Sequence, residues 1–218
     1  MVTVSDDVSA VEADLVEGRI GCAGCGGRLR PWGSARGRQV REALDGQGPP
    51  GRHRPRRGRC AGCGATHVLL AVSLAARRAD AAVVIAAAVA AKVIKGWGHR
   101  RIAAALGRPA STVRGWLRSF TASAGAIGEA FMSWVVRDAP DAAALWPAPN
   151  REPAARALGV LGAYAVALGR RFGIGVLAWV RAAIGATNGW LFSSSWWARA
   201  GQHELALTPV RWGPSGSR

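Results

Sequence analysis

The pentapeptide Cys-Ala-Gly-Cys-Gly occurs twice in this chain of 218 residues, at Cys22–Gly26 and at Cys60–Gly64, and the two copies contain all four cysteines. Two residues between cysteines let both thiolates of one turn bind the same ion, and two such turns supply the four sulfurs of a tetrahedral zinc site. The glycine after each second cysteine suits a turn that needs positive φ. The sequence therefore predicts a structural Zn²⁺ site, with Cys22, Cys25, Cys60 and Cys63 as its ligands.

Three other interpretations of the cysteines are weaker. Disulfides are typical of exported proteins, and the acidic first 17 residues lack the basic start and apolar run of a secretory signal. A redox pair would need only one motif, at a strand–helix junction, and chance cysteines would not repeat a pentapeptide. The 34 residues between Cys25 and Cys60 exceed the usual spacing of about 15 to 20. We therefore expect an inserted hairpin or loop around Gly46–Gly51.

Short β segments near 28–32, 39–42 and 66–70 would complete a zinc ribbon. A site with four thiolates has no open coordination position, so we expect the metal to hold the fold together and not to catalyse. With four cysteines available, we interpret His53 and His67 as surface or strand residues and not as ligands.

The formal net charge of +16 is concentrated between residues 21 and 121, which hold 19 Lys and Arg but three Asp and Glu. A merely solvated surface would spread the cations and mix the signs, whereas such confinement is typical of a nucleic-acid-binding region. Arg52–Arg59 has five arginines in eight residues and no acid. We interpret it as a phosphate-contacting strip, the alternative being an edge strand whose charges discourage aggregation.

The segment His99–Arg118 carries the strongest positional pattern in the chain. Apolar residues recur at spacings of three and four on both sides of Gly107, as on the buried faces of two short helices. Helices joined by a tight turn must cross steeply, which requires a small residue at their contact, and Ala103 fills that position. The apolar residues of the two faces are Ile102, Ala103, Leu106, Val113, Trp116, Leu117 and Phe120.

This pattern resembles the bacterial helix–turn–helix motif. With His99 as the first position, the small fifth residue is Ala103 and the glycine at the ninth is Gly107. The packed apolar residues at the fifteenth and eighteenth positions are Val113 and Trp116. The resemblance implies a second helix from residue 110 to about 120, entering the major groove by its N-terminal end.

Within that helix, Arg114 and Arg118 share one face, and Arg114 is the better candidate for a guanine O6/N7 contact. Arg118 and the flanking arginines suit phosphates, contacts that position the protein without reading sequence. We expect a support helix at 79–95, begun by Asp80 as a cap or first-turn acid, with Val84, Ile85 and Val89 facing inward. The candidate DNA-contacting residues are Arg100, Arg101, Arg108, Ser111, Thr112, Arg114, Gly115 and Arg118.

A four-cysteine ribbon followed by a helix–turn–helix resembles the N-terminal region of several insertion-sequence transposases. The stretches LRPWGSARGR, RCAGCGATHVLL, RRADAAVV and HRRIAAALGRPASTVRGWLR are more closely similar to a family of transposase-like proteins of GC-rich bacteria. The resemblance covers about residues 21–120 and implies zinc at the four cysteines and DNA binding at Ser111–Arg118.

The resemblance does not extend to the catalytic domain of such transposases, which cut DNA with three acidic residues on an RNase-H-like sheet. Fewer than 100 residues follow position 121, and they show no strand pattern that would carry the acids. The acidic residues in that part are Glu129, Asp138, Asp141, Glu152 and Glu204. We therefore expect no recombinase activity.

We expect a mainly α chain with a small β zinc ribbon. The apolar runs at 157–169 and 172–180 are shorter than the roughly 18 to 20 residues that span a bilayer, so we expect a soluble cytoplasmic protein without a membrane partner. The C-terminal helices either close a bundle or form a homodimer interface. The predicted parts are a flexible acidic leader (1–20), the zinc ribbon (21–72), the helix–turn–helix (77–121), a C-terminal helical region (122–187) and a loosely ordered tail (188–218).

The leading functional interpretation is a non-catalytic, sequence-specific protein that binds double-stranded DNA, either a transcriptional regulator or the remnant or subunit of a transposase. An RNA-binding zinc-ribbon protein is the alternative; it requires exposed aromatic residues near the ribbon, where the sequence offers Trp32. An enzyme would need a nucleophile–base pair or a carboxylate cluster, which four scattered histidines and sparse acids do not supply.

Overall fold

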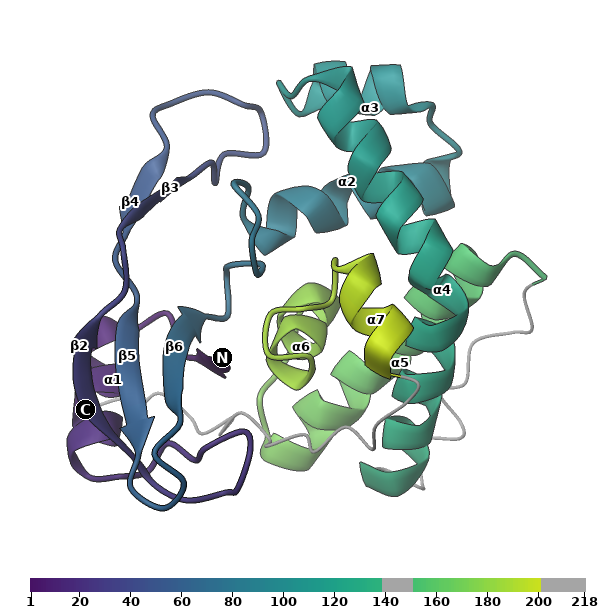
Figure 1. Ribbon diagram of the computed structural model, residues 1–218. Coiled ribbons are helices and arrows are strands. Elements are labelled where there is room, and N and C mark those ends of the chain that lie inside the picture. The colour runs from purple at the N-terminus through teal and green to yellow at the C-terminus, as the bar shows by residue number, and fades with distance from the viewer. Residues whose placement is uncertain (139–150, 201–218) are drawn as a thin grey trace.

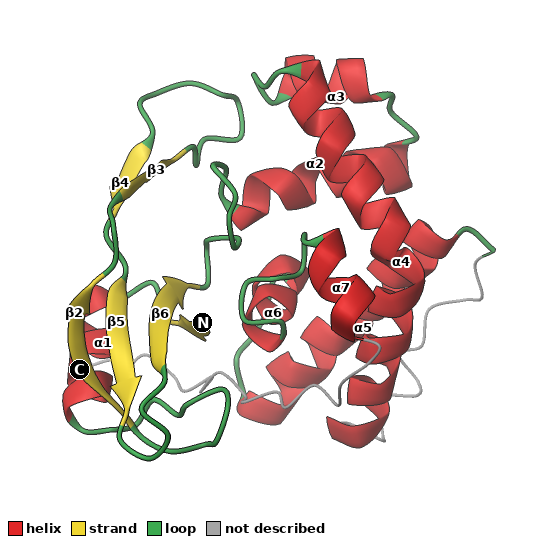
Figure 2. Ribbon diagram, in the orientation of Figure 1, coloured by secondary structure: helices red, strands yellow, loops and turns green. Residues whose placement is uncertain are grey.

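The computed structural model describes residues 1–138 and 151–200. In this part of the chain, a sheet unit (residues 2–71) lies beside a helical unit (residues 82–138 and 153–200) (Figures 1 and 2). The elements are β1 (Val2–Val4), α1 (Val8–Val16), β2 (Leu29–Ser34), β3 (Arg38–Val40), β4 (Gly51–His53), β5 (Arg56–Cys60), β6 (Thr66–Ala71), α2 (Ala82–Lys95), α3 (His99–Ala105), α4 (Ala110–Asp138), α5 (Pro153–Phe172), α6 (Trp179–Ala186) and α7 (Ser194–Ala200).

The four-stranded sheet has the order β1-β6-β5-β2. Strand β5 runs antiparallel to both β2 and β6, and β1 pairs in parallel with β6, with Val2 opposite Leu69. Strands β3 and β4 pair with each other as a separate hairpin in the insertion between the two cysteine turns. The three predicted β segments are present as β2, β3 and β6, with ends that differ by at most two residues.

The prediction of a flexible leader over residues 1–20 is wrong. Residues 2–16 form β1 and α1, and the Asp7 carboxylate caps α1 by accepting hydrogen bonds from two backbone N–H groups of its first turn. Val11 and Leu15, four residues apart on α1, are buried against the sheet. The acids that suggested a free segment instead pair with arginines, Glu12 with Arg56 and Asp14 with Arg19.

The helical unit is built around α4, which has 29 residues. The second helix predicted at 110–120 therefore continues through Gly125 to Asp138, and its inward face passes from the helix–turn–helix into the C-terminal core. Phe131 lies in that core, with its ring centroid 4.5 Å from that of Trp134 and 5.1 Å from that of Tyr164. The helix–turn–helix and the helical region predicted at 122–187 thus share one core; residues 139–150 lie outside the described part.

The apolar faces of α5 and α6 pack within the chain. Leu161 and Ile184 are fully buried in the same core as Phe131. This packing corresponds to the bundle interpretation and gives no support to a homodimer interface. In the described segments, no helix combines the length and the apolar character needed to cross a bilayer.

The prediction of a loosely ordered tail places its start, residue 188, too early in the chain. Leu191, Phe192 and Trp197 are buried against the helical core, and the Trp197 indole N–H donates to the Leu191 carbonyl at 2.9 Å. Large apolar side chains therefore hold the chain through α7. The rest of the predicted tail, residues 201–218, lies outside the described part.

Candidate metal site and nucleic-acid interface

Two matching turns bring the four cysteines together. The Sγ atoms of Cys22, Cys25, Cys60 and Cys63 all lie within 4.8 Å of one another. The Sγ–Sγ distance is 3.8 Å between Cys22 and Cys63 and 3.4 Å between Cys25 and Cys60. Four sulfurs placed tetrahedrally at about 2.3 Å from a zinc ion are about 3.8 Å apart. The predicted ligands therefore form a cluster that can hold a metal ion.

The backbone of the two turns is arranged in the same way. Gly26 and Gly64 each donate an N–H to the carbonyl of the first cysteine of their own turn, at 2.9 and 3.1 Å. Both glycines have positive φ, 71° and 73°, as the repeated pentapeptide predicts. Backbone N–H groups also point at sulfur and favour its thiolate form. These contacts are Gly24 to Cys22 at 3.4 Å and Cys63 to Cys60 at 3.5 Å.

Backbone N–H groups and neighbouring sulfurs shift the pKa values of Cys25 and Cys60 in opposite directions. A hydrogen bond from the backbone N–H of Cys63 is the main reason that the pKa of Cys60 is lowered to about 6. The Gly27 N–H lowers the pKa of Cys25, but hydrogen bonds shared with the other three cysteine sulfurs, together with burial, outweigh it, and this pKa is raised to about 11. Four sulfurs this close require a cation before all can be thiolates, and a divalent metal supplies that charge.

Neither histidine near the motif belongs to the four-sulfur cluster, but His67 supports it. His53 Nε2 makes a hydrogen bond of 2.7 Å with Glu42 Oε1, away from the cysteines. His67 Nε2 lies 3.1 Å from Cys22 Sγ, and burial lowers the pKa of His67. A neutral ring next to a ligand atom can donate a hydrogen bond that orients the ligand. The sequence analysis missed this contact.

Helices α2, α3 and the first turns of α4 have the predicted helix–turn–helix arrangement. Ile102 and Ala103 on α3 and Val113, Trp116 and Phe120 on α4 are buried, which brings the two apolar faces together. Helix α2 buries the three side chains predicted for the support helix, although it begins at residue 82 and not at 79. These side chains are Val84, Ile85 and Val89.

Comparison with known protein families agrees with this geometry. Residues 77–129 match the family model of the homeodomain-like domain. These residues form a helix–turn–helix domain. The match includes α2, α3 and much of α4, about a quarter of the chain, and it supports DNA as the binding partner. Searches of curated proteins and of solved structures gave no match.

Most of the predicted DNA-contacting residues lie on the surface of this domain. Arg100 and Arg101 of α3 are exposed, and the guanidinium carbon of Arg101 lies 4.1 Å from the centre of the Trp97 ring. Thr112 is half-buried. Arg108 is buried and does not share this surface. The exposed predicted residues on α4 are Ser111, Arg114, Gly115 and Arg118.

A basic hollow of about 480 Å³ lies beside the exposed face of α4. Its basic side chains are Lys92 of α2, His99 of α3, and Arg114 and Arg118 of α4. Sequence reasoning missed Lys92 and His99. His99 is the first residue of the predicted motif and Lys92 precedes it on α2, but their position relative to α4 depends on how the three helices cross. A concave surface with four basic side chains suits a DNA phosphate group.

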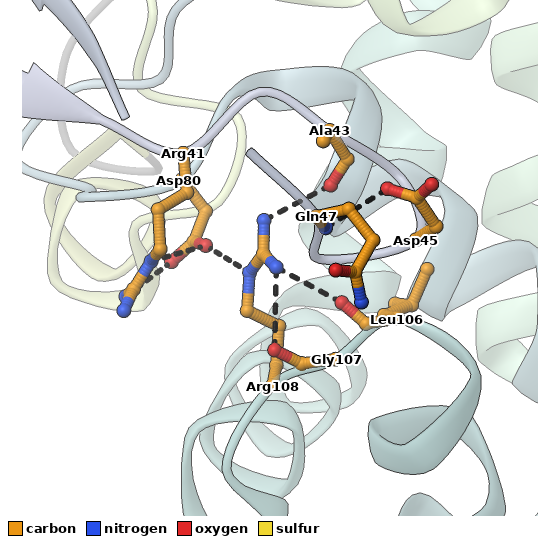
Figure 3. A network of polar contacts seen from close by, with 8 residues as sticks. All are labelled: Arg41, Ala43, Asp45, Gln47, Asp80, Leu106, Gly107 and Arg108. Atoms are coloured by element: carbon orange, nitrogen blue, oxygen red, sulfur yellow. Dashed lines mark hydrogen bonds and ion pairs between the residues drawn. The ribbon is translucent and has the colours of Figure 1, made fainter. Parts of the chain in front are cut away.

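Arg108 was predicted to contact the DNA backbone, and this prediction is wrong. Its side chain is 2% exposed, and its Nε donates to Oδ1 of the equally buried Asp80 at 2.6 Å (Figure 3). The other guanidinium N–H groups donate to the carbonyls of Leu106, Gly107 and Ala43 at 2.9, 3.3 and 3.1 Å. Arg108 therefore stabilises the turn between α3 and α4.

Asp80 was predicted to be a cap or first-turn acid of the support helix, and this prediction is wrong. Helix α2 begins at Ala82, and the Asp80 carboxylate is buried in a network of arginines. The Arg41 Nε donates to Oδ1 of Asp80 at 3.0 Å, and a second nitrogen of the Arg41 guanidinium donates to Oδ2 of Asp80 at 3.1 Å (Figure 3). Asp80 thus joins the chain just after β3 to the helix–turn–helix turn through Arg108.

The same turn also contacts the β3–β4 loop directly. A Cβ added at Gly46 would lie 2.7 Å from the Gly107 Cα atom, and a Cβ at Gly107 would lie 2.8 Å from the Gly46 Cα. Glycine is therefore required at both positions by close backbone approach as well as by positive φ. The loop inserted between the cysteine turns supports the helix–turn–helix.

The predicted phosphate-contacting strip Arg52–Arg59 is only partly available to a ligand. Arg56 pairs with Glu12 of α1, and Arg57 is half-buried. Arg52 and Arg54 are exposed, and so is Arg59, whose guanidinium lies against an aromatic ring of β2. The strip therefore divides between fold-stabilising and exposed arginines.

Proposed function

We propose that this protein is a non-catalytic, zinc-stabilised, sequence-specific DNA-binding protein that reads the major groove with the first turns of α4. The observation that carries this proposal is the surface of α4 inside the matched domain. Arg114 and Arg118 are exposed on one side, whereas Val113 and Trp116 hold the other side in the core. A helix fixed in this way can enter a groove with its exposed side chains toward the bases.

The residues of this surface have different roles in the proposal. Arg114, near the start of α4, carries the planar fork that matches O6 and N7 of guanine. Arg118, Lys92 and His99 form the basic hollow beside it and hold phosphates. Arg100 and Arg101 extend these contacts along α3, with Arg101 held in place by the Trp97 ring. Phosphate contacts set the orientation and base contacts set the specificity.

Zn²⁺ is the metal that we propose for the four-cysteine site. Thiolate ligands and tetrahedral sulfur spacing suit zinc, and four protein ligands leave no position for a substrate. The metal would fix the two turns and, through the loop between them, support the helix–turn–helix. Thiols that must stay reduced are consistent with a cytoplasmic protein.

Two biological roles use such an interface. The resemblance of the ribbon and helix–turn–helix to insertion-sequence transposases favours the DNA-binding remnant or subunit of a transposase. A transcriptional regulator would bind through the same residues. The location of the selected sequence distinguishes them, because a transposase part would bind the ends of a mobile element and a regulator would bind promoters.

We expect selection from a random pool of duplex DNA to enrich a defined sequence. The affinity for that sequence should fall about a thousandfold between about 50 and 200 mM salt, as for a protein that contacts about six phosphates. An RNA duplex of the same sequence is the control, because its deep, narrow major groove excludes α4. Failure to enrich any sequence, or equal binding to the RNA duplex, would contradict the proposal.

A further inference from the structure

The sheet unit has an exposed basic surface that the helix–turn–helix does not use. We call it the Trp32 patch and define it as Arg30, Trp32 and Arg59. Trp32 is 51% exposed on β2, an edge strand of the sheet, and the guanidinium carbon of Arg59 lies 4.7 Å from the centre of its ring. Arg30 stands directly opposite Arg59 in the β2–β5 register, so the two side chains share a face.

The patch faces away from α1. Gly58, the neighbour of Arg59 on β5, lies on the opposite face, where an added Cβ would meet the Leu29 and Leu15 side chains at 3.1 to 3.4 Å. Because side chains alternate along a strand, Arg59 must project from the other side of the sheet. The Trp32 patch is therefore on the outer face, separate from the small core beneath α1.

The arginines of this outer face lack the acidic partners found elsewhere in the sheet unit. Arg56 and Arg19 pair with acids of α1 and its C-terminal end. Over the described residues, neither Arg30 nor Arg59 forms an ion pair, and β2, β5 and β6 contain no Asp or Glu. Like charges directly opposite each other across two strands destabilise a sheet. An anion bound between them would remove that repulsion.

Two explanations that need no ligand account for part of the patch. The cation–π contact explains where Arg59 lies, and charge on an edge strand discourages aggregation. Neither explains why half of a tryptophan side chain stays exposed beside two cations. An aromatic ring next to unpaired arginines is the combination that binds single-stranded nucleic acid, where bases stack on the ring and phosphates contact the cations. Bases inside a duplex are already stacked on one another.

We propose that the Trp32 patch binds single-stranded DNA, with one base stacked on Trp32 and the flanking phosphates held by Arg30 and Arg59. This site is distinct from the duplex-reading surface of α4 and does not depend on it. Single-stranded DNA is the ligand to which we commit, and this choice rests on the proposed function, in which the same chain binds DNA through its helix–turn–helix. None of the three side chains requires a 2′-hydroxyl.

The test compares three probes on the metal-loaded full chain by fluorescence anisotropy at fixed salt. These are a short oligothymidylate, an abasic oligonucleotide of the same length, and the matching oligouridylate. We expect the oligothymidylate to bind about tenfold more tightly than the abasic strand, which has the phosphates but no bases to stack. Equal affinity for these two strands, or tighter binding of the oligouridylate, would overturn the proposal.

Substitutions then assign the site. Trp32→Ala should reduce oligothymidylate affinity to the abasic level, and Trp32→Phe should retain most of it because a phenyl ring still stacks. Metal content and duplex binding should not change in either variant. Arg114→Ala should keep single-strand binding while it loses duplex preference, so failure of this site is distinguishable from failure of the duplex interface. If Trp32→Ala leaves oligothymidylate binding unchanged, the assignment of the site to Trp32 is wrong.

Discussion

Cys60→Ser is expected to release the metal and unfold the sheet unit while the helical unit stays folded. The core of the sheet unit is small, with eight buried residues, and two of them are the proposed metal ligands Cys22 and Cys60. The apparent free energy of binding a structural zinc ion is about 10 to 16 kcal/mol in zinc-finger peptides, as large as the stability of a whole domain. The helical unit has a larger core, to which β3 and β6 contribute Val40 and Leu70, so we expect it to stay folded without the metal and to lose only the support that the β3–β4 loop gives its turn.

Hydrogen exchange measured by mass spectrometry tests this expectation, together with the metal content. Exchange should become fast in residues 22–34 and 56–71 of Cys60→Ser, or of the wild type after chelation, and stay slow in 110–138. Ala61→Ser is the matched control, since Ala61 is exposed in the same turn and supplies no ligand atom. Unchanged protection of 22–34 and 56–71 in metal-free protein would show that the metal does not hold this unit together.

Asp80→Ala is expected to reduce the free energy of unfolding by about 3 to 5 kcal/mol. The reason is that it leaves the Arg108 guanidinium, 2% exposed, as a buried charge without its carboxylate. The substitution also removes the partner of Arg41 and thereby loosens the contact between the β3–β4 region and the helix–turn–helix turn. Urea denaturation followed by tryptophan fluorescence measures the change.

The matched control is Asp14→Ala, because Asp14 pairs with Arg19 at the surface, where both side chains are about one-third exposed. Such a pair contributes about 0 to 1 kcal/mol. The double variant Asp80→Ala/Arg108→Ala should cost less than the sum of the two single variants, since each removes the same interaction. If Asp80→Ala costs no more than Asp14→Ala, the buried network does not stabilise the turn.

Features with a fixed local spacing were predictable from the sequence. The two pentapeptides specify their own turns, and the four ligands of a tetrahedral zinc site predict that the two turns come together. The faces of α3 and α4 follow in the same way from apolar spacings of three and four around Gly107. The second helix was predicted from residue 110, where α4 begins.

Features that depend on distant residues were not predictable. Arg108 has the sequence position of a DNA contact, but its partner Asp80 lies 28 residues earlier and Ala43 lies 65 residues earlier. Tertiary packing alone brings these groups together. The prediction of a flexible leader over residues 1–20 was wrong for a related reason. The acids of this segment suggested that it is solvated, whereas Val11 and Leu15 form a narrow apolar face. That face becomes stable only against a sheet made by later residues.

The central claim is that a metal-stabilised ribbon supports a helix that reads duplex sequence, and Arg114→Ala tests it most directly. The measurement is the dissociation constant of this variant for the selected duplex and for an unrelated duplex, with Arg170→Ala, an exposed arginine at the end of α5, as control. We expect Arg114→Ala to weaken binding to the selected sequence by about 10- to 100-fold and to change binding to the unrelated duplex little. An equal loss on both duplexes would contradict base reading by α4.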